Sequence, residues 1–164
     1  MFANGWADEG QRVYTIPGVS ADVMRLIIQY AYTCSVPVTE DNVQDLLEAA
    51  DYLNIMGLVR TCCSFLEAQL CPENCISIAG LAGFYNCPEL KRRADAFVLG
   101  HFEEIALVSQ EFLELSLEQL SDIIEKDQLD VRQEEVVFQA VLRWISHQPE
   151  EREPCISLLL PKVE

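Results

Sequence analysis

From residue 20 onward, apolar side chains recur with the period of an α-helix, and this pattern restricts the fold more than any other feature. Ser20 follows the turn signal Pro17-Gly18 and is the expected N-cap of the first helix. The predicted buried face of this helix follows the i, i+3, i+4, i+7 spacing and consists of Met24, Ile27, Ile28 and Ala31. The same period continues along the chain and predicts a mostly α-helical protein.

Two further helices are predicted before residue 71. We expect Thr39 to cap a helix that ends at Leu53, and a third helix to run over residues 55–70. The predicted buried positions are Val43, Leu46, Leu47 and Ala50 in one and Leu58, Cys62, Phe65 and Leu66 in the other. The β-prone stretch "QRVYTI" (11–16) and the short "SVPV" (35–38), a possible edge piece, are the strand candidates.

Two prolines predict a helical hairpin after residue 71. Proline is favoured at the first position of a helix because its missing N–H has no intrahelical partner there. Pro72 and Pro88 therefore predict helices over 72–84 and 88–101, each opened by the tripeptide Cys-Pro-Glu.

The remaining sequence is also predicted to be helical. Ser116 and Gln119 have the spacing of a capping box, and a last helix is expected over residues 150–160, before Pro161. Between them, the segment "QEEVVFQAVLRWISH" (133–147) carries one apolar stripe, formed by Val137, Ala140, Val141, Trp144 and Ile145. The whole pattern predicts about nine helices and at most two short strands.

Charge and composition restrict the class of partner. The net charge is −16 and the pI is about 4.3, so phosphate backbones and anionic lipid surfaces would be repelled. No apolar run approaches the ~18–20 residues that cross a bilayer. Seven cysteines, an odd number, without a visible secretory signal favour reduced thiols in the cytosol or nucleus.

The sequence offers no arrangement of residues that is typical of catalysis. His101 and His147 fall at predicted helix ends, where a cation favours the helix dipole. No glycine-rich phosphate loop is present. The clustered cysteines lack a CxxC pair and a following histidine pair, so a zinc site is disfavoured at Cys62, Cys63, Cys71, Cys75 and Cys87. We therefore expect no enzyme, no cofactor and no metal.

The opening "MFANGWADEG" contains a tryptophan in a polar setting. Trp6 either packs back onto a core or is exposed for a partner protein, and the residues alone leave both alternatives open.

Several stretches resemble a known family. The helix end "YAYT" (30–33), "VTEDNVQDLLEAADYL" (38–53) and "CCSFLEAQL" (62–70) resemble the C-terminal half of a BTB (POZ) domain of the kelch-like type. "LDVRQEEVVFQAVLRWISH" (129–147) resembles the BACK domain, and residues 72–101 resemble the 3-box that opens it.

The resemblance implies a fold and a domain order. Residues 1–70 are expected to be a partial BTB domain, with helices and one or two short strands. Residues 71–164 are expected to be an all-α BACK domain that stops near its middle. The first half of the BTB domain and the kelch propeller of the family are expected to be missing, so the isolated segment 1–70 should be less stable than 71–164.

The resemblance also implies a function. Kelch-like BTB–BACK proteins are adaptors that bind cullin-3 through the BTB domain and 3-box, present substrates to the ubiquitin ligase and form dimers through the BTB domain. The expected contacts with the cullin-3 N-terminal domain are Trp6, Asp8, Tyr32, Pro72, Asn74 and Ile76. Trp6 and Asp8 match the family pattern of a hydrophobic residue followed two positions later by an acid, although the family more often has Glu than Asp.

Two alternatives stay open beside the cytoplasmic ligase adaptor. One is an oligomerisation module or scaffold that forms a homodimer or pairs with another BTB chain, without a ligase role. The other, much less favoured, is an enzyme or metal protein that uses the cysteines.

Overall fold

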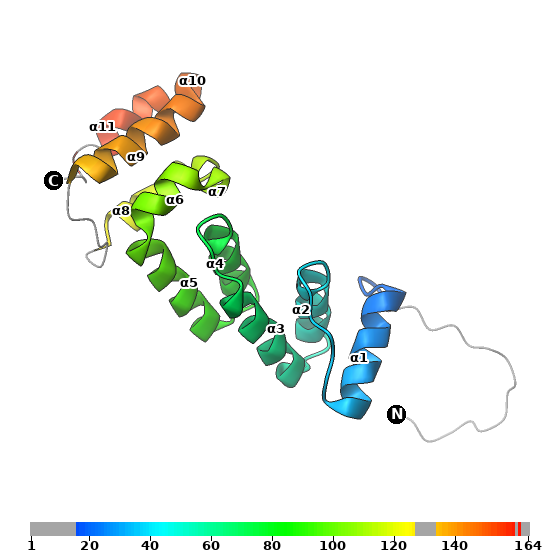
Figure 1. Ribbon diagram of the computed structural model, residues 1–164. Coiled ribbons are helices and arrows are strands. Elements are labelled where there is room, and N and C mark those ends of the chain that lie inside the picture. The colour runs from blue at the N-terminus through cyan, green and yellow to red at the C-terminus, as the bar shows by residue number, and fades with distance from the viewer. Residues whose placement is uncertain (1–15, 127–133, 160, 162–164) are drawn as a thin grey trace, which may run out of the picture.

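The computed structural model describes residues 16–126, 134–159 and 161, and these residues form a bent row of helices (Figure 1). None of them lies in a strand. The helices of the first half are α1 (Ala21–Thr33), α2 (Val43–Tyr52), α3 (Met56–Ala68), α4 (Cys75–Phe84) and α5 (Pro88–Gly100). The second half contains α6 (Phe102–Val108), α7 (Gln110–Leu113), α8 (Leu117–Ile124), α9 (Glu134–His147), α10 (Pro149–Arg152), the 3-10 helix η1 (Glu153–Cys155) and α11 (Ile156–Leu159).

The first hydrophobic core lies between α1, α2, α3, α4 and the beginning of α5. Its fully buried leucines are Leu46, Leu47, Leu58 and Leu90, each at most 1% exposed. The predicted apolar face of α2 is confirmed, because all four of its positions are buried.

The second core lies between the start of α4, the end of α5 and helices α6 to α11, and its α4 member is Cys75. Phe102 and Phe112 meet edge to face, with ring centroids 5.9 Å apart. The buried indole N–H of Trp144 donates to the carbonyl oxygen of Leu115 at 2.8 Å. All five positions of the predicted apolar stripe of α9 are buried.

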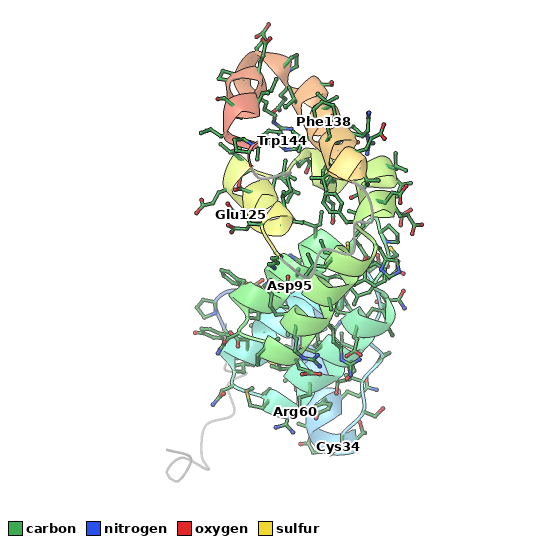
Figure 2. The ribbon with its side chains drawn as sticks, turned by 90° about the vertical axis from the view of Figure 1, so that its left-hand side faces the viewer. Cys34, Arg60, Asp95, Glu125, Phe138 and Trp144 are labelled. Atoms are coloured by element: carbon green, nitrogen blue, oxygen red, sulfur yellow. The ribbon has the colours of Figure 1, made fainter. Side chains whose placement is uncertain are left out.

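Helix α5 joins the two cores. Leu90 and Ala94 belong to the first core, and Val98, one turn further along, belongs to the second. Figure 2 shows Asp95 of α5 between Cys34 at one end of the molecule and Trp144 near the other. A cut at residue 70 would therefore separate α4 and α5 from the helices α1 to α3 with which they share the first core.

The caps explain where several helices begin. Ser20 accepts the backbone N–H of Val23 at 3.2 Å, which confirms its predicted role as N-cap of α1. The predicted capping box of α8 is also confirmed, since Ser116 and Gln119 exchange hydrogen bonds of 3.2 and 3.0 Å. Pro88 is the first residue of α5, as predicted.

Three predictions about the first half were wrong. Thr39 does not cap α2, which begins four residues later at Val43. Pro72 does not begin α4, because residues 72–74 form a turn and the helix starts at Cys75. Residues 35–38 are not a strand, and of the other strand candidate only Ile16 is described, outside any strand.

The buried face of α1 also differs from the prediction. Val23 and Ile27 are buried, whereas the expected core residue Ile28 is 49% exposed and Ala31 is exposed. Apolar residues occupy most positions of this helix, so the sequence carries two overlapping apolar stripes. Packing against α2 selects the stripe that includes Val23, since α2 is the element that contacts α1 most.

In the described part of the chain, no helix is both long and apolar enough to cross a membrane.

Candidate partner-binding groove

A groove of about 730 Å³ lies between α2, α3 and α4. Its walls come from the start of α2, the end of α3, the link between α3 and α4, and α4 itself. The apolar lining residues are Val43, Phe65, Leu66, Ala68, Leu70, Ile78 and Leu81. Its volume is in the range of sites that hold a ligand or a short stretch of a partner protein.

Two hydrogen bonds from one asparagine side chain to the backbone shape the link between α3 and α4. The Asn74 side chain accepts the N–H of Cys71 at 2.9 Å and donates to the carbonyl oxygen of Gln69 at 2.8 Å. This side chain closes the turn over residues 71–74 by bonding backbone groups that precede it in the sequence. The Asn74 hydrogen bonds thereby fix the direction of α4 relative to α3.

An asparagine makes the same pair of hydrogen bonds before α2, on the other wall of the groove. The Asn42 side chain accepts the N–H of Thr39 at 2.8 Å and donates to the carbonyl oxygen of Pro37 at 2.9 Å. The two segments read "TEDN" and "CPEN", so each asparagine follows its turn's first residue by three positions. This spacing was the sequence signal for the two helix starts, and the interpretation based on Thr39 and Pro72 missed it.

The groove combines an apolar floor with acidic edges. Glu40 and Glu73 line it and are exposed, and no lysine or arginine is among its lining residues. Such a surface fits a partner segment that inserts apolar side chains and offers cations or N–H donors at the edge.

The structure brings few of the predicted contact residues together. Asn74 lines the groove, and Pro72 lies two residues before it, half-buried in the turn. Ile76 is half-buried and packs against the second core. Tyr32 is 87% exposed on the last turn of α1, away from the groove lining. Trp6 and Asp8 lie outside the described residues.

The cysteines form a small cluster between α3 and the start of α5. Burial raises the pKa of Cys62 to about 11, with a further contribution from Cys87. Burial and the neighbouring Cys87 thiol raise the pKa of Cys63 to about 12. These thiols are protonated at neutral pH, and the thiol form is a poor nucleophile and metal ligand. Within the described ranges, no group of three or more metal-ligating side chains is arranged to hold an ion.

The two histidines lie at helix ends, as predicted. The His101 ring stacks on Phe97 at the end of α5, with ring centroids 4.2 Å apart, and His147 is the last residue of α9.

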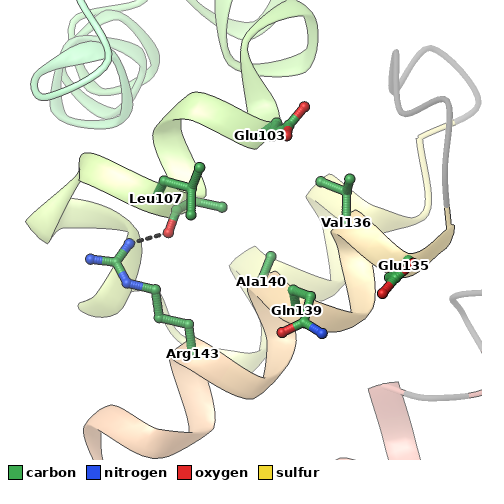
Figure 3. Close-up of a pocket in the computed structure, with 8 residues that line it drawn as sticks. Glu103, Leu107, Glu135, Val136, Gln139, Ala140 and Arg143 are labelled. Carbon is green, nitrogen blue, oxygen red and sulfur yellow. Dashed lines mark hydrogen bonds between the residues drawn. The ribbon is translucent and has the colours of Figure 1, made fainter.

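A second groove, of about 560 Å³, lies between α6 and α9 (Figure 3). The Arg143 guanidinium donates to the carbonyl oxygen of Ala106 and ties the two helices together at one end. None of the predicted contact residues lines this groove. The first groove therefore remains the candidate site.

Two family models match the chain. The model of the BTB/POZ domain matches residues 1–70, and the model of BACK (BTB And C-terminal Kelch) matches residues 75–164. The candidate groove lies at the junction of the two matched segments, with walls from both.

Curated proteins of known name also match. Kelch-like protein 2 from Rattus norvegicus and from Homo sapiens are each 37% identical to the chain over 163 residues, and the protein of the same name from Mus musculus is 36% identical. Each match covers 99% of this chain and 27% of the relative. The chain thus spans about a quarter of the length of the relatives that it matches.

Proposed function

Because the chain belongs to the kelch-like BTB–BACK family, we propose that it is the substrate-adaptor module of a cullin-3 RING ubiquitin ligase. Family members are adaptors, so the work of this chain is binding rather than catalysis. The module acts in the cytoplasm, and the boundary between its BTB and BACK parts lies between residues 70 and 71.

The groove at the junction of the two domains is the observation that supports this proposal most. It presents apolar side chains from both α3 and α4, and Phe65 and Leu81 among them are half-buried and available to a partner side chain. Burying apolar side chains in such a groove is the main source of affinity at protein interfaces. We propose that a segment of the cullin-3 N-terminal domain binds here.

The remaining contacts are divided between the groove and the residues before it. In this proposal Asn74 and Pro72 form one edge of the interface. Ile76 supports the start of α4 by packing against the second core. Trp6 and Asp8 supply the aromatic anchor and its acidic neighbour, and Tyr32 extends the contact along α1.

A binding experiment with the recombinant cullin-3 N-terminal domain tests this function. Ala68 is an exposed lining residue, so Ala68→Arg blocks the groove without disturbing a core. We expect this variant to bind at least about tenfold more weakly, as expected when a central contact is lost. Ala96→Arg is the matched control, because Ala96 is exposed on α5 outside the groove.

Calorimetric titration of both variants gives a clear decision. No detectable binding by the wild-type chain would refute the ligase role, and equal affinity of the two arginine variants would refute the groove as its site. Trp6→Ala and Asp8→Ala are measured in the same series. Unchanged affinity in both of these would remove them from the interface.

A scaffold that acts through self-association is the second candidate function. It is favoured by the open face of α1, where Ile28 is 49% exposed and Tyr32 is 87% exposed. Light scattering distinguishes this function: a dimer that dissociates in the variant Tyr32→Ser, together with no capture of cullin-3, would favour the scaffold.

A further inference from the structure

One side chain on α7, beside the second core, reaches back to the wall of the groove. Glu111, the second residue of α7, accepts the backbone N–H of Ser77 at 3.1 Å and also accepts the Ser77 hydroxyl. The two residues are 34 positions apart in the sequence. Ser77 is the third residue of α4 and lines the groove, whereas Glu111 does not.

This contact gives α4 a cap that its own sequence does not supply. The first N–H groups of a helix lack intrahelical acceptors, and a side chain usually satisfies one of them. Asn74 precedes α4, but its side chain forms no cap because it closes the preceding turn. The Glu111 carboxylate satisfies the N–H of Ser77 instead, and its negative charge also favours the helix N-terminus.

The cap comes from an element that the second core holds firmly. Phe112 and Leu113, the next two residues of α7, are buried, and α7 packs on α9. Glu111 therefore adds a polar contact to the start of α4, whose first residue, Cys75, is itself buried in this core. The groove residues Ile78 and Leu81 follow Ser77 on the same helix.

We propose that Glu111 is a positioning residue for the groove: it holds the first turn of α4 in the orientation that a bound partner segment requires. The second core thereby contributes to partner affinity without touching the partner. The statement about affinity rests on the proposed binding of cullin-3, whereas the statement about α4 does not.

The position of α4 is tested first, without any partner. Amide hydrogen exchange of Ser77, followed by NMR in the full chain, is compared between wild type and Glu111→Ala. We expect exchange to be about fivefold faster in the variant, as loss of one N-cap interaction predicts. Glu114→Ala is the matched control, because Glu114 is exposed just after α7 and its replacement removes the same charge.

Affinity for the cullin-3 N-terminal domain is then measured with the same variants. Glu111→Ala is expected to bind about fivefold more weakly, at the lower end of typical couplings between sites. Glu111→Gln should restore most of the affinity, because its amide oxygen still accepts the N–H of Ser77. Circular dichroism at 222 nm confirms that each variant is folded.

Each outcome decides one statement. Unchanged exchange in Glu111→Ala, or equal exchange in Glu114→Ala, would overturn the positioning role. Faster exchange with unchanged affinity would overturn the link to the groove. If the wild-type chain binds no cullin-3, the proposed function fails and the exchange comparison alone decides whether Glu111 positions α4. Ser77→Ala, which removes only the hydroxyl contact, is the second variant for that comparison.

Discussion

Arg152 is the one charged residue that is buried in the described part of the chain, and it lies at the second core. It is 9% exposed, and its Nη1 atom donates to the carbonyl oxygens of Leu113 at 2.7 Å and Trp144 at 2.9 Å. Its guanidinium lies 4.1 Å from the centre of the Trp144 ring. One side chain thus joins α7, α9 and α10, and it satisfies a carbonyl in the last turn of α9, which has no intrahelical partner.

We predict that Arg152→Met lowers the free energy of unfolding by about 3 kcal/mol. A hydrogen bond to a charged donor contributes about 1.5–3 kcal/mol, and a desolvated cation–π contact contributes up to about 2 kcal/mol. Part of this sum is offset, because the variant no longer buries a charge. The two carbonyl oxygens left without a donor keep the net effect destabilising.

Urea unfolding followed by circular dichroism and tryptophan fluorescence measures this change. The slope with urea should stay constant while the midpoint falls, since the buried area is similar. The melting temperature should fall by about 6–12 °C for a chain of this length. Arg152→Lys should lose less, because an ammonium group can still donate to one carbonyl.

The control is Arg60→Met, which removes the same charge from an exposed position on α3. Its midpoint should match that of the wild-type chain. An equal midpoint for Arg152→Met and wild type would refute the reasoning, because two buried carbonyl oxygens would then lack a donor at no cost.

Three further predictions concern local features. Ser116→Ala should lower stability by about 1 kcal/mol in urea unfolding, because it removes half of the capping box of α8. Cys34 ends α1 with a φ of 52°, so Cys34→Gly should raise the melting temperature by relieving left-handed backbone strain of about 1 kcal/mol. The pKa of Cys62 and Cys75 is about 11 and that of Cys63 about 12, against 9.0 for a free thiol, chiefly because of burial. The folded state keeps these protons after the unfolded state has lost them, so their contribution to stability is complete below pH 9 and is lost as the pH rises toward 11–12. Urea midpoints at pH 7.5 and pH 10 check this decline, which should be smaller in a variant with alanine at the three positions.

The sequence predicted most of the helices because their signals are local. The face of α2 and the stripe of α9 follow from the spacing of apolar residues, and the caps at Ser20 and Ser116 from residue types within one turn. The fold class was confirmed on these grounds. The prediction was weakest for α1, because apolar residues occupy most positions of this helix and the packing of α2 decides which of them are buried.

The candidate site was predicted only in outline. The family resemblance directed attention to residues 72–101, and Asn74 does line the groove. The roles of Asn42 and Asn74 were missed because Thr39 and Pro72 offered more familiar start signals. An asparagine can close the turn before a helix as well as cap it, and spacing alone does not separate the two.

Sequence by itself determined that this chain forms helices, where many of them begin, and that its surface is acidic. Tertiary structure decided which face of α1 is buried, that α5 belongs to two cores, and that a groove opens between α2, α3 and α4. It also placed Glu111 on Ser77. The physical reason is the separation along the sequence of the residues that interact. A helix repeats every 3.6 residues, so residues close in sequence determine it. The groove and its support join residues that lie more than thirty positions apart and meet only in the folded chain.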